Sequence, residues 1–520
     1  MLRWHLVALA LVLGLGACTE ETSTYCDGDH GCTNPALPRC DYATRTCRPP
    51  DDGGALDGGT ADAPTDGNGA DAGCTSSSAC LESAAPICAA GACRACASPA
   101  ECSARDPAAP GCAADGRCVA CVGSTDCPNA ATPICASETC RGCQNAAECA
   151  ARSTATPACH ADGRCVECRA NLDCASQTDT PACDLATSTC VPCTSDDQCS
   201  YFCDATTGRC ATTAEITFVD KAGPSCASAG TGAGTLADPF CEIKTAVANL
   251  GSARFVYVRP GSYQGVIANG PSFRLRAEAG AMITSTTGTA CFGVGFGSTV
   301  EVVGLRIAGG GLSKAGFAVS NSAGKLTLRG VRAENLGDYG VRCDTGGTLV
   351  MDRSEVLHNT RGGLYLSDCA FTVTNSVIAE NGSATAPFGG VYIETAHAGA
   401  SFVNNTVVSN HATTGTVAGI LCATAAQVVN SVVWFNDPPQ VTNPSCAVIY
   451  SNVAQSGLGG VGNINAAPSF VSLVSGNYHY APGSPGIDVA TATVAPDHDF
   501  DGYPRPYGGA PDMGAFEWHP

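Results

Sequence analysis

The chain has 520 residues, of which 36 are cysteine and 61 are glycine, and its formal net charge is −20. This acid excess argues against nucleic acid as a partner and against docking on anionic lipid through a basic patch. Cysteine at this density is typical of proteins in an oxidising compartment outside the cytoplasm. A chain of this length has room for several domains.

The first residues have the features of an export signal. The apolar run from Leu6 to Leu15 is too short to span a bilayer. Small residues directly before Cys18 resemble the lipobox of bacterial lipoproteins. The resemblance implies that residues 1–17 are a signal peptide and that Cys18 carries lipid. By resemblance to the sorting rule of enteric lipoproteins, Thr19 in place of aspartate after the cysteine implies the outer membrane. The alternative is an ordinary signal peptide, with Cys18 in a disulfide.

A first set of four cysteines and an acidic spacer follow. Residues 18–48 contain the anchor and this first cysteine module. Residues 49–73 are rich in Gly, Asp, Ala and Pro and contain no aromatic side chain to bury. Repulsion between the aspartates and the lack of apolar surface predict a disordered linker.

Residues 74–212 repeat a four-cysteine pattern with a period of 22 to 25 residues, which indicates a tandem array. Each module has few large apolar residues to bury, such as Leu81, Ile87 and Ile134. We therefore expect two disulfides per module, each contributing roughly 2–4 kcal/mol. Four cysteines allow three connectivities, among which the spacing does not choose. Zinc is the alternative, which an oxidising compartment disfavours.

From residue 213 the sequence changes to short strand-like runs. Glycine-led segments recur, as at 315–319 and 339–343, and each is followed by a second strand-like run and by a third that ends in asparagine. Stacked coils of such strands, about 4.8 Å apart, bury a core that one coil cannot. We expect the asparagines to take αL geometry at a corner and to share hydrogen bonds between coils. These asparagines are Asn335, Asn359, Asn381, Asn410 and Asn436.

This pattern resembles the pectin-lyase-like right-handed β-helix superfamily. The resemblance implies an all-β fold for residues 213–520: a right-handed parallel β-helix, or solenoid, preceded by a disulfide-rich repeat region. Residues 218–263, with an expected helix from Glu242 to Leu250, look like the N-terminal cap, and residues 483–517 resemble the closing block of bacterial surface β-helix proteins. The resemblance is specific for fold and weak for function, because the superfamily includes lyases, hydrolases, epimerases and adhesive proteins.

Cysteines are sparser in the β-helix region. If Cys18 is lipidated, an odd number of cysteines remains, and Cys291 is the candidate for a buried unpaired thiol. The expected disulfides of this region join neighbours: Cys226 with Cys241, Cys343 with Cys369, and Cys422 with Cys446.

Strand alternation predicts which side chains leave the core. If Val341 and Cys343 point inward, the residues between and after them point outward. Tyrosine rings can stack on sugar rings and charges can hold uronates, so the outward residues form a candidate glycan-binding strip. The strip contains Arg342, Tyr365 and Tyr392, accompanied by Asp344, Asp368 and Glu394. The competing interpretation is an ordinary solvated sheet face.

A lyase is the alternative use of the same residues. Lyases of this superfamily place calcium-binding carboxylates beside an arginine or lysine that removes a proton. Arg342 would be that base, with Asp344, Asp368 and Glu394 around the metal. Because these acids are scattered along the sequence, a simple ion pair between Arg342 and Asp344 is as good an account.

A second acidic motif lies near the C-terminus. Asp497, Asp499 and Asp501 match the first half of a calcium loop. Gly508 stands where the bidentate acid should come, so turn-forming aspartates are favoured, with Asp501 paired to Arg505.

The sequence favours a non-enzymatic surface protein, lipid-anchored in the outer membrane, that displays a β-helix for adhesion or glycan binding. The first alternative is a surface-tethered polysaccharide lyase or epimerase that acts on uronate-containing polymers, with calcium as its cofactor. The second is a structural envelope protein. The expected partners are the membrane, through lipid on Cys18, and a cell-surface or environmental polysaccharide.

Overall fold

The computed structural model describes most of residues 73–520 and two short strands before them, β1 (Arg39–Asp41) and β2 (Thr46–Arg48). The predicted signal peptide, the lipidation site Cys18 and the linker at 49–73, apart from its last residue, lie outside the described residues. Within the described part of the chain, no helix is long and apolar enough to cross a membrane. The described residues are 39–41, 46–48, 73–228, 230–285, 290–312, 314–321, 323–397, 399–438, 440–441 and 445–520.

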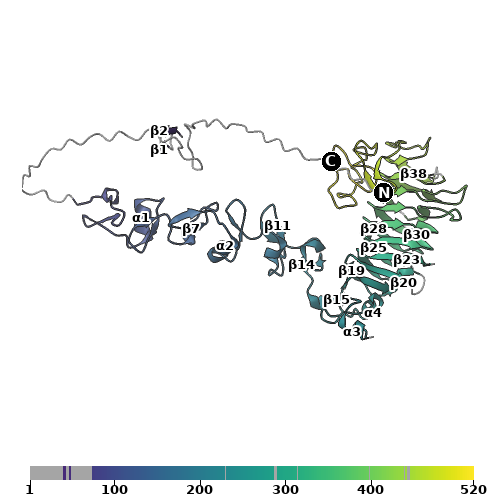
Figure 1. Ribbon diagram of the computed structural model, residues 1–520, viewed down its shortest axis with the longest axis horizontal. Helices are drawn as coiled ribbons and strands as arrows, with labels where there is room; N and C mark the ends of the chain where they lie inside the picture. The colour runs from purple at the N-terminus through teal and green to yellow at the C-terminus, as the bar shows by residue number, and fades with distance from the viewer. Residues whose placement is uncertain are drawn as a thin grey trace, which may run out of the picture. The chain divides into compact units, whose positions relative to one another are not determined.

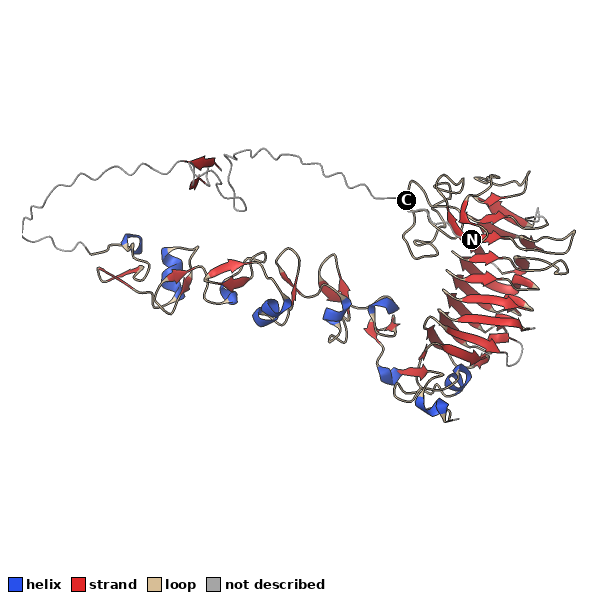
Figure 2. Cartoon of the chain, in the orientation of Figure 1, coloured by secondary structure: helices blue, strands red, loops and turns tan. Residues whose placement is uncertain are grey.

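Each four-cysteine module combines a short helical turn with a two-stranded hairpin, coloured blue and red in Figure 2. Where both pairs are described, disulfides join the first cysteine to the third and the second to the fourth, as in Cys96–Cys112 and Cys102–Cys118. The structure thus has one of the three connectivities that the spacing allowed. The same pattern recurs at Cys121–Cys135, Cys127–Cys140, Cys143–Cys159, Cys149–Cys165, Cys168–Cys183, Cys174–Cys190, Cys193–Cys203 and Cys199–Cys210.

The secondary structure of the modules is short because each loop closes on a disulfide. The helical turns are η1 (Ser77–Ala79), α1 (Pro99–Arg105), η2 (Ser124–Asp126), α2 (Ala146–Arg152), η3 (Asn171–Cys174) and η4 (Asp196–Gln198). The hairpins pair β3 (Ile87–Ala89) with β4 (Ala92–Arg94), β5 (Gly111–Cys112) with β6 (Cys118–Val119), β7 (Ile134–Ala136) with β8 (Thr139–Arg141), β9 (Ala158–Cys159) with β10 (Cys165–Val166), β11 (Ala182–Asp184) with β12 (Thr189–Val191), and β13 (Cys203–Asp204) with β14 (Arg209–Cys210).

Half-cystines make up most of the buried residues in a module. Ile87 and Ile134 are buried, as expected, beside cysteines such as Cys102. The expectation that Leu81 is also buried is wrong, because its side chain is 91% exposed. Cys80, which directly precedes it, fills the small interior instead and is 1% exposed.

After η5 (Thr213–Glu215), parallel strands wind into a β-helix with three faces, here called sheets 1, 2 and 3. In Figure 1 the strands stack in chain order from β15 to β38. Sheet 1 contains β15 (Ile216–Val219), β16 (Phe255–Val258), β19 (Phe273–Ala277), β22 (Thr299–Val303), β25 (Lys325–Arg329), β28 (Thr348–Asp352), the second part of β30 (Gly362–Thr374), β33 (Ser401–Val403), β36 (Ala426–Val429) and β38 (Cys446–Ile449).

The other two sheets follow the same stacking order. Sheet 2 contains β17 (Gly261–Gln264), β20 (Ala281–Ser285), β23 (Arg306–Leu312), β26 (Arg332–Leu336), β29 (Glu355–Leu357), β31 (Val377–Ala379), β34 (Thr406–Val408), β37 (Val432–Trp434) and β39 (Asn452–Val453). Sheet 3 contains β18 (Val266–Asn269), β21 (Ala290–Gly295), β24 (Ala315–Ser320), β27 (Tyr339–Asp344), the first part of β30, β32 (Val391–Ala396) and β35 (Ile420–Cys422).

The core of the β-helix consists of columns of apolar side chains in register from coil to coil. On sheet 1, one inward column runs through Phe273, Val300, Leu326, Leu349 and Phe371, which are all buried. Each side chain packs on the coil above and below it, so the column grows by repetition of one short motif.

An asparagine ladder lines the corner between sheets 2 and 3. The Asn381 amide group donates to Asn410 Oδ1 at 3.0 Å, and the Asn410 amide donates to Asn436 Oδ1 at 2.8 Å. The αL residue at this corner is the one before the ladder asparagine, such as His358 before Asn359. The expectation that the ladder asparagines themselves are αL is therefore wrong.

Asn335 takes the αL position at this corner, with φ of 58°, and is not a member of the ladder. Leu336 stands at the ladder position of that coil, and its N–H donates to Asn359 Oδ1. The ladder therefore ends at this coil, because leucine cannot continue the side-chain hydrogen bonds.

Helix α4 (Ile243–Ala248), which follows the short helix α3 (Pro224–Ala227), and the last cysteine module close the N-terminal end of the β-helix. The Phe202 ring stacks on Phe255 with 4.9 Å between centroids. Arg274 on β19 binds Asp196 at 2.9 Å and donates to a module carbonyl at 2.7 Å. Aromatic packing and ion pairs therefore join this module to the first coils.

The C-terminal residues cover the outward side of sheet 2. The hairpin of β40 (Phe470–Ser472) and β41 (Asn477–Tyr480) leads into a segment without long strands. Val377 and Val408 on sheet 2 pack against Phe516 and its neighbours. The apolar outward positions of these later coils are thus covered by the C-terminal block, residues 465–520.

Candidate functional site

The predicted strip residues lie in one outward column on sheet 3. Arg342 on β27 is in register with Tyr365 on β30, and Tyr365 is in register with Tyr392 on β32. Adjacent coils of a parallel sheet lie about 4.8 Å apart, so the three side chains form a continuous row.

Two aromatic residues that were not predicted extend this row. The Tyr339 ring stacks on the Tyr365 ring with 5.0 Å between centroids. The Phe388 ring contacts two rings, with its centroid 5.4 Å from that of Tyr339 and 5.3 Å from that of Tyr392. Tyr339 and Phe388 are nearly fully buried. The open aromatic surface of the strip therefore belongs to Tyr365 and Tyr392, which are partly exposed.

The loop between β31 and β32 brings Phe388 over sheet 3. Gly362, at the start of β30, makes room for the ring, because a Cβ there would come 2.5 Å from it. A single glycine opposite a loop phenylalanine has no periodic signal, so the alternation that located Tyr365 could not reveal this contact.

Arg342 is held between a carboxylate and a ring. Its Nε donates to Asp344 Oδ2 at 2.5 Å, and its guanidinium lies 5.7 Å from the centroid of the Tyr365 ring. The Arg342 side chain remains 45% exposed. It is thus a fixed positive charge beside an exposed tyrosine, which suits an acidic sugar.

The remaining carboxylates of the strip have separate partners. The Tyr365 hydroxyl donates to Glu394 at 2.7 Å, and hydrogen bonds from Ser367 and Tyr365 lower the pKa of Glu394. Asp368 pairs with the His397 ring at 2.7 Å. Partial burial raises the pKa of Tyr365, so its hydroxyl stays protonated near neutral pH.

These carboxylates do not fit a calcium cage. Calcium takes six to eight oxygen ligands around one centre. Asp344, Asp368 and Glu394 are engaged by an arginine, a histidine and a tyrosine respectively. No step of a reaction is therefore assigned to calcium at this strip.

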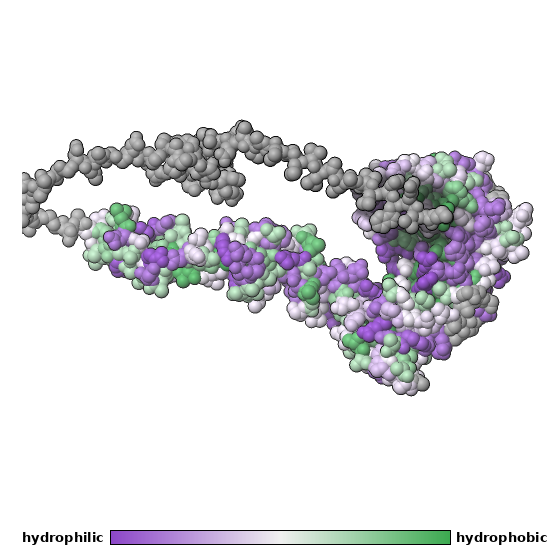
Figure 3. Space-filling view, in the orientation of Figure 1, coloured by the Kyte–Doolittle hydropathy of each residue, from purple (hydrophilic) through white to green (hydrophobic). Residues whose placement is uncertain are grey.

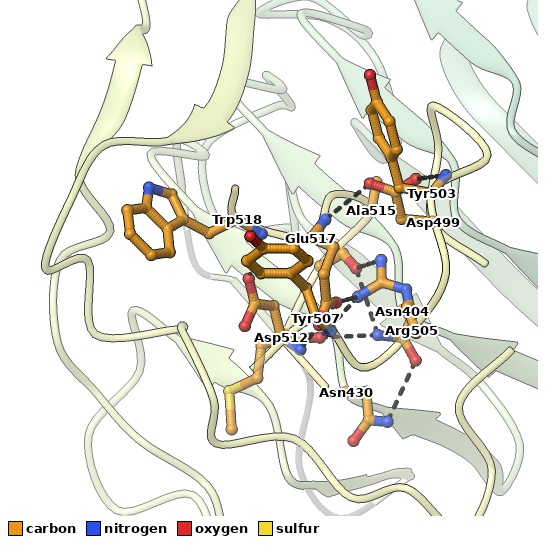
Figure 4. A network of polar contacts seen from close by, with 12 residues as sticks. Asn404, Asn430, Asp499, Tyr503, Arg505, Tyr507, Asp512, Ala515, Glu517 and Trp518 are labelled. Atoms are coloured by element: carbon orange, nitrogen blue, oxygen red, sulfur yellow. Dashed lines mark hydrogen bonds and ion pairs between the residues drawn. The ribbon is translucent and has the colours of Figure 1, made fainter. Parts of the chain in front are cut away.

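The aspartates near the C-terminus also point to different partners. Asp499 is buried and accepts the backbone N–H groups of Tyr503 and Glu517 at 2.8 and 2.9 Å, as Figure 4 shows. Asp501 pairs with a histidine, His479, at 2.7 Å, and the exposed Asp497 pairs with His498 at 2.6 Å. The three carboxylates serve the local turns and do not fit a calcium loop.

Arg505 binds a different acid from the one expected. The pairing with Asp501 is wrong, because Arg505 is buried and binds Glu517 at 2.6 Å. The same guanidinium donates to the carbonyls of Asp512 and Gly514. A buried arginine requires several acceptors, and the interior of the block supplies them to Arg505 (Figure 4). The Asp501 side chain, which is 33% exposed, binds His479 instead.

The cysteines of the β-helix region pair between neighbours. Each of the disulfides Cys343–Cys369 and Cys422–Cys446 joins a strand of sheet 3 to a residue of the following coil, and Cys226–Cys241 closes the cap loop. Cys291 is the one free cysteine among the described residues, and burial raises the pKa of its thiol to about 12. That thiol is therefore unreactive at neutral pH.

Residues 282–433 match a family model described as a right-handed β-helix region. Residues 121–216, which include the later cysteine modules, match a family of unknown function (DUF8331). No curated protein sequence matches the chain significantly.

Among solved structures, the chain is similar to the crystal structure of pectate lyase Pel9A, with 14% sequence identity and a TM-score of 0.31 over 58% of this chain and 96% of that chain. A TM-score of this size supports no argument about activity.

The family match and the parallel sheets define the fold class. The predicted right-handed parallel β-helix, preceded by a disulfide-rich repeat region, is confirmed. The chain carries this β-helix at 282–433, within a longer set of stacked strands that runs from β15 to β39.

Proposed function

We propose that the chain is a non-enzymatic surface lipoprotein whose β-helix binds uronate-containing glycans. The row formed by Arg342, Tyr365 and Tyr392 carries the proposal, because it offers a charge and two partly exposed rings at the spacing of adjacent coils. Rings of this kind pack on apolar sugar faces, and the guanidinium can hold a carboxylate in two parallel hydrogen bonds.

The geometry favours a binding strip over a lyase. A lyase that used Arg342 as its base would need a guanidinium that gives up its proton. The Arg342 guanidinium is instead engaged by Asp344, with 2.5 Å between Nε and Oδ2. Glu394 and Asp368 are already engaged by Tyr365 and His397.

Binding to immobilised polygalacturonate and alginate tests the strip. We expect Tyr392→Ala to weaken binding about tenfold, because it removes one of the two partly exposed rings of the row. Tyr507→Ala is the matched control, since Tyr507 is 55% exposed and lies in the C-terminal block. Equal binding by the two variants would contradict the proposed strip.

The same polymers test for catalysis. A non-enzymatic protein leaves the ultraviolet absorbance of the solution unchanged, whereas a lyase produces unsaturated sugars that absorb. An increase in absorbance that disappears in Arg342→Ala would show that the protein is a lyase and would overturn the proposed non-enzymatic function.

The proposed anchor is tested in cells. Cys18→Ser removes the thiol that would carry lipid. We expect the unchanged chain to incorporate a labelled fatty acid and to fractionate with the outer membrane, and the variant to do neither. Fatty acid on both proteins would contradict the assignment of Cys18.

A further inference from the structure

A second polar surface lies on sheet 1, on a different face of the β-helix from the strip. Here the last cysteine module and strands β19, β22 and β25 enclose a groove with a volume of about 780 Å³. Residues 194–197 and 203–206 of the module form one wall. In Figure 3, hydrophilic side chains gather over the edge of the β-helix that carries β25 and β28.

The charge of the groove is opposite to that of the chain. Six cations and four carboxylates line it, whereas the whole chain has a net charge of −20. Cations concentrated in one concave surface of an acidic protein create a local field that attracts anions. The cations are Arg254, Arg274, Arg276, Lys325, Arg329 and Arg353.

Three of these cations hold the module in place. Arg274 binds Asp196, Arg276 donates to the carbonyl of Tyr201 at 2.8 Å, and Arg254 lies 3.3 Å from Asp204. These three arginines hold the module wall in place, and their guanidinium groups are largely occupied by those contacts.

The other three cations lie away from the module. The Lys325 side chain is exposed, and its ammonium group has no hydrogen-bond or ion-pair partner among the described residues. Arg329 binds Glu301 at 2.9 Å and lies 3.7 Å from Asp352, and Arg353 lies 3.5 Å from Asp352. The two arginine side chains nevertheless remain 42% and 38% exposed. Their contacts leave them able to bind a further anion.

The spacing of these cations indicates a chain-like ligand. Lys325 and Arg329 are at opposite ends of β25, roughly 13 Å apart by the rise of a strand. A single small anion cannot touch both, but a linear polymer with repeated charges can. Thr327 lies between them, and Thr299 stands beside Lys325 on the neighbouring strand, so both offer hydroxyls to sugar hydroxyls.

We propose that this groove binds an anionic polysaccharide, with Lys325, Arg329 and Arg353 holding its sulfate or carboxylate groups. Among the described residues, the only aromatic ones that line the groove are Phe255 and Phe273, and both are 4% exposed. Single-stranded nucleic acid is bound mainly through exposed rings that stack on bases, so the lining favours a polysaccharide.

The test compares two charge reversals in the full chain. Lys325→Glu changes the groove, and Lys314→Glu makes the same change in net charge at an exposed lysine that does not line it. We expect Lys325→Glu to weaken binding of heparin or polygalacturonate about tenfold at low ionic strength, and Lys314→Glu to leave it nearly unchanged. Unaltered thermal unfolding of both variants shows that folding is intact.

The polymers separate the two anion chemistries and the competing class of ligand. Stronger binding of heparin identifies sulfate as the preferred group, and stronger binding of polygalacturonate identifies carboxylate. Equal losses in the two variants, no binding to either polymer, or tighter Lys325-dependent binding of single-stranded DNA would each overturn the proposal. Tyr392→Ala should retain the Lys325-dependent binding of heparin while it weakens binding of polygalacturonate at the strip, and this difference distinguishes the groove from the strip on sheet 3.

Discussion

The cysteine modules and the β-helix solve the same packing problem in different ways. In the modules the buried residues are mostly half-cystines, while Leu81, Leu172 and Leu185 are 91%, 83% and 71% exposed. In the β-helix, residues such as Leu326 and Leu349 are fully buried in columns. A unit of about twenty residues cannot enclose its own aliphatic side chains, whereas a coil of similar length can because its neighbours cover them.

The difference also concerns the backbone. The hairpins of the modules are two or three residues long per strand and pair only within one module. The strands of the β-helix pair with strands of the preceding and following coils. Cooperative hydrogen bonding therefore extends through the β-helix but stops within each module, where covalent links replace it.

Reduction should separate the two regions most strongly. Two disulfides per module contribute roughly 2–4 kcal/mol each, so we expect a thiol reductant to remove amide protection from residues 94–210. The β-helix should keep its protection, because its disulfides Cys343–Cys369 and Cys422–Cys446 are buried, at most 4% exposed, and most of its core is aliphatic and aromatic. Hydrogen exchange with and without reductant measures this. Simultaneous loss in both regions would show that they unfold together.

A cavity in the core tests the columns. Leu349→Ala should destabilise the β-helix by about 2–5 kcal/mol, because Leu349 is fully buried between Leu326 and Phe371. The midpoint of denaturant unfolding measures this. Leu172→Ala in a module is the matched control and should change stability by less than about 0.5 kcal/mol. Similar losses at the two leucines would contradict the contrast in burial.

Loss of a ladder asparagine should have a smaller but clear effect. Asn410→Ala leaves the carbonyls of Ile378 and Val408 without their side-chain donor and breaks the bonds to Asn381 and Asn436. Buried groups left without partners cost about 1–3 kcal/mol each before relaxation. An unchanged unfolding midpoint would mean that the backbone ladder alone holds this corner.

The smallest predicted effect is on the docking of the C-terminal block. His498 binds Asp352 at 3.0 Å, and this hydrogen bond raises the pKa of His498. Burial opposes ionisation of Asp352, but hydrogen bonds from His498, Asn375 and Thr374 hold its pKa below the usual value.

The pair therefore stabilises docking in a limited pH window. The histidine contribution is complete below about pH 6.5 and is lost as pH rises through its raised pKa. The aspartate contribution is complete above about pH 4 and is lost at lower pH. We expect exchange protection of residues 498–517 to be highest near pH 5 and to fall by pH 8. His498→Gln should flatten the decline, and an unchanged slope would assign it to other groups.

Repetition explains how much of the molecule could be predicted. Cysteine spacing located the modules, and strand alternation placed Arg342, Tyr365 and Tyr392 in one outward row. Period-two alternation fixes the face of a side chain but not what covers it, so the contact with Phe388 was missed. The predicted ladder position in the first coil was wrong by one residue: Asn335 takes the αL conformation, and Leu336, the next residue, stands at the hydrogen-bonding position.

The groove on sheet 1 had no signal in the sequence. Its wall depends on Arg274 and Asp196, which lie in different regions of the chain and repeat nowhere else. Such contacts arise only when the last module is placed on the first coils, and neither spacing nor composition specifies that placement.

The disulfides between coils have a consequence for how the molecule comes apart. A solenoid is held only by nearest neighbours, so it opens by fraying from its ends. Cys422–Cys446 and Cys343–Cys369 fasten successive coils at two depths from the C-terminal end, and Cys226–Cys241 fastens the opposite end. A protease that clips a frayed coil would release no fragment across these bonds. The oxidised β-helix can thus be nicked between Cys422 and Cys446, or between Cys343 and Cys369, without covalent loss of a fragment.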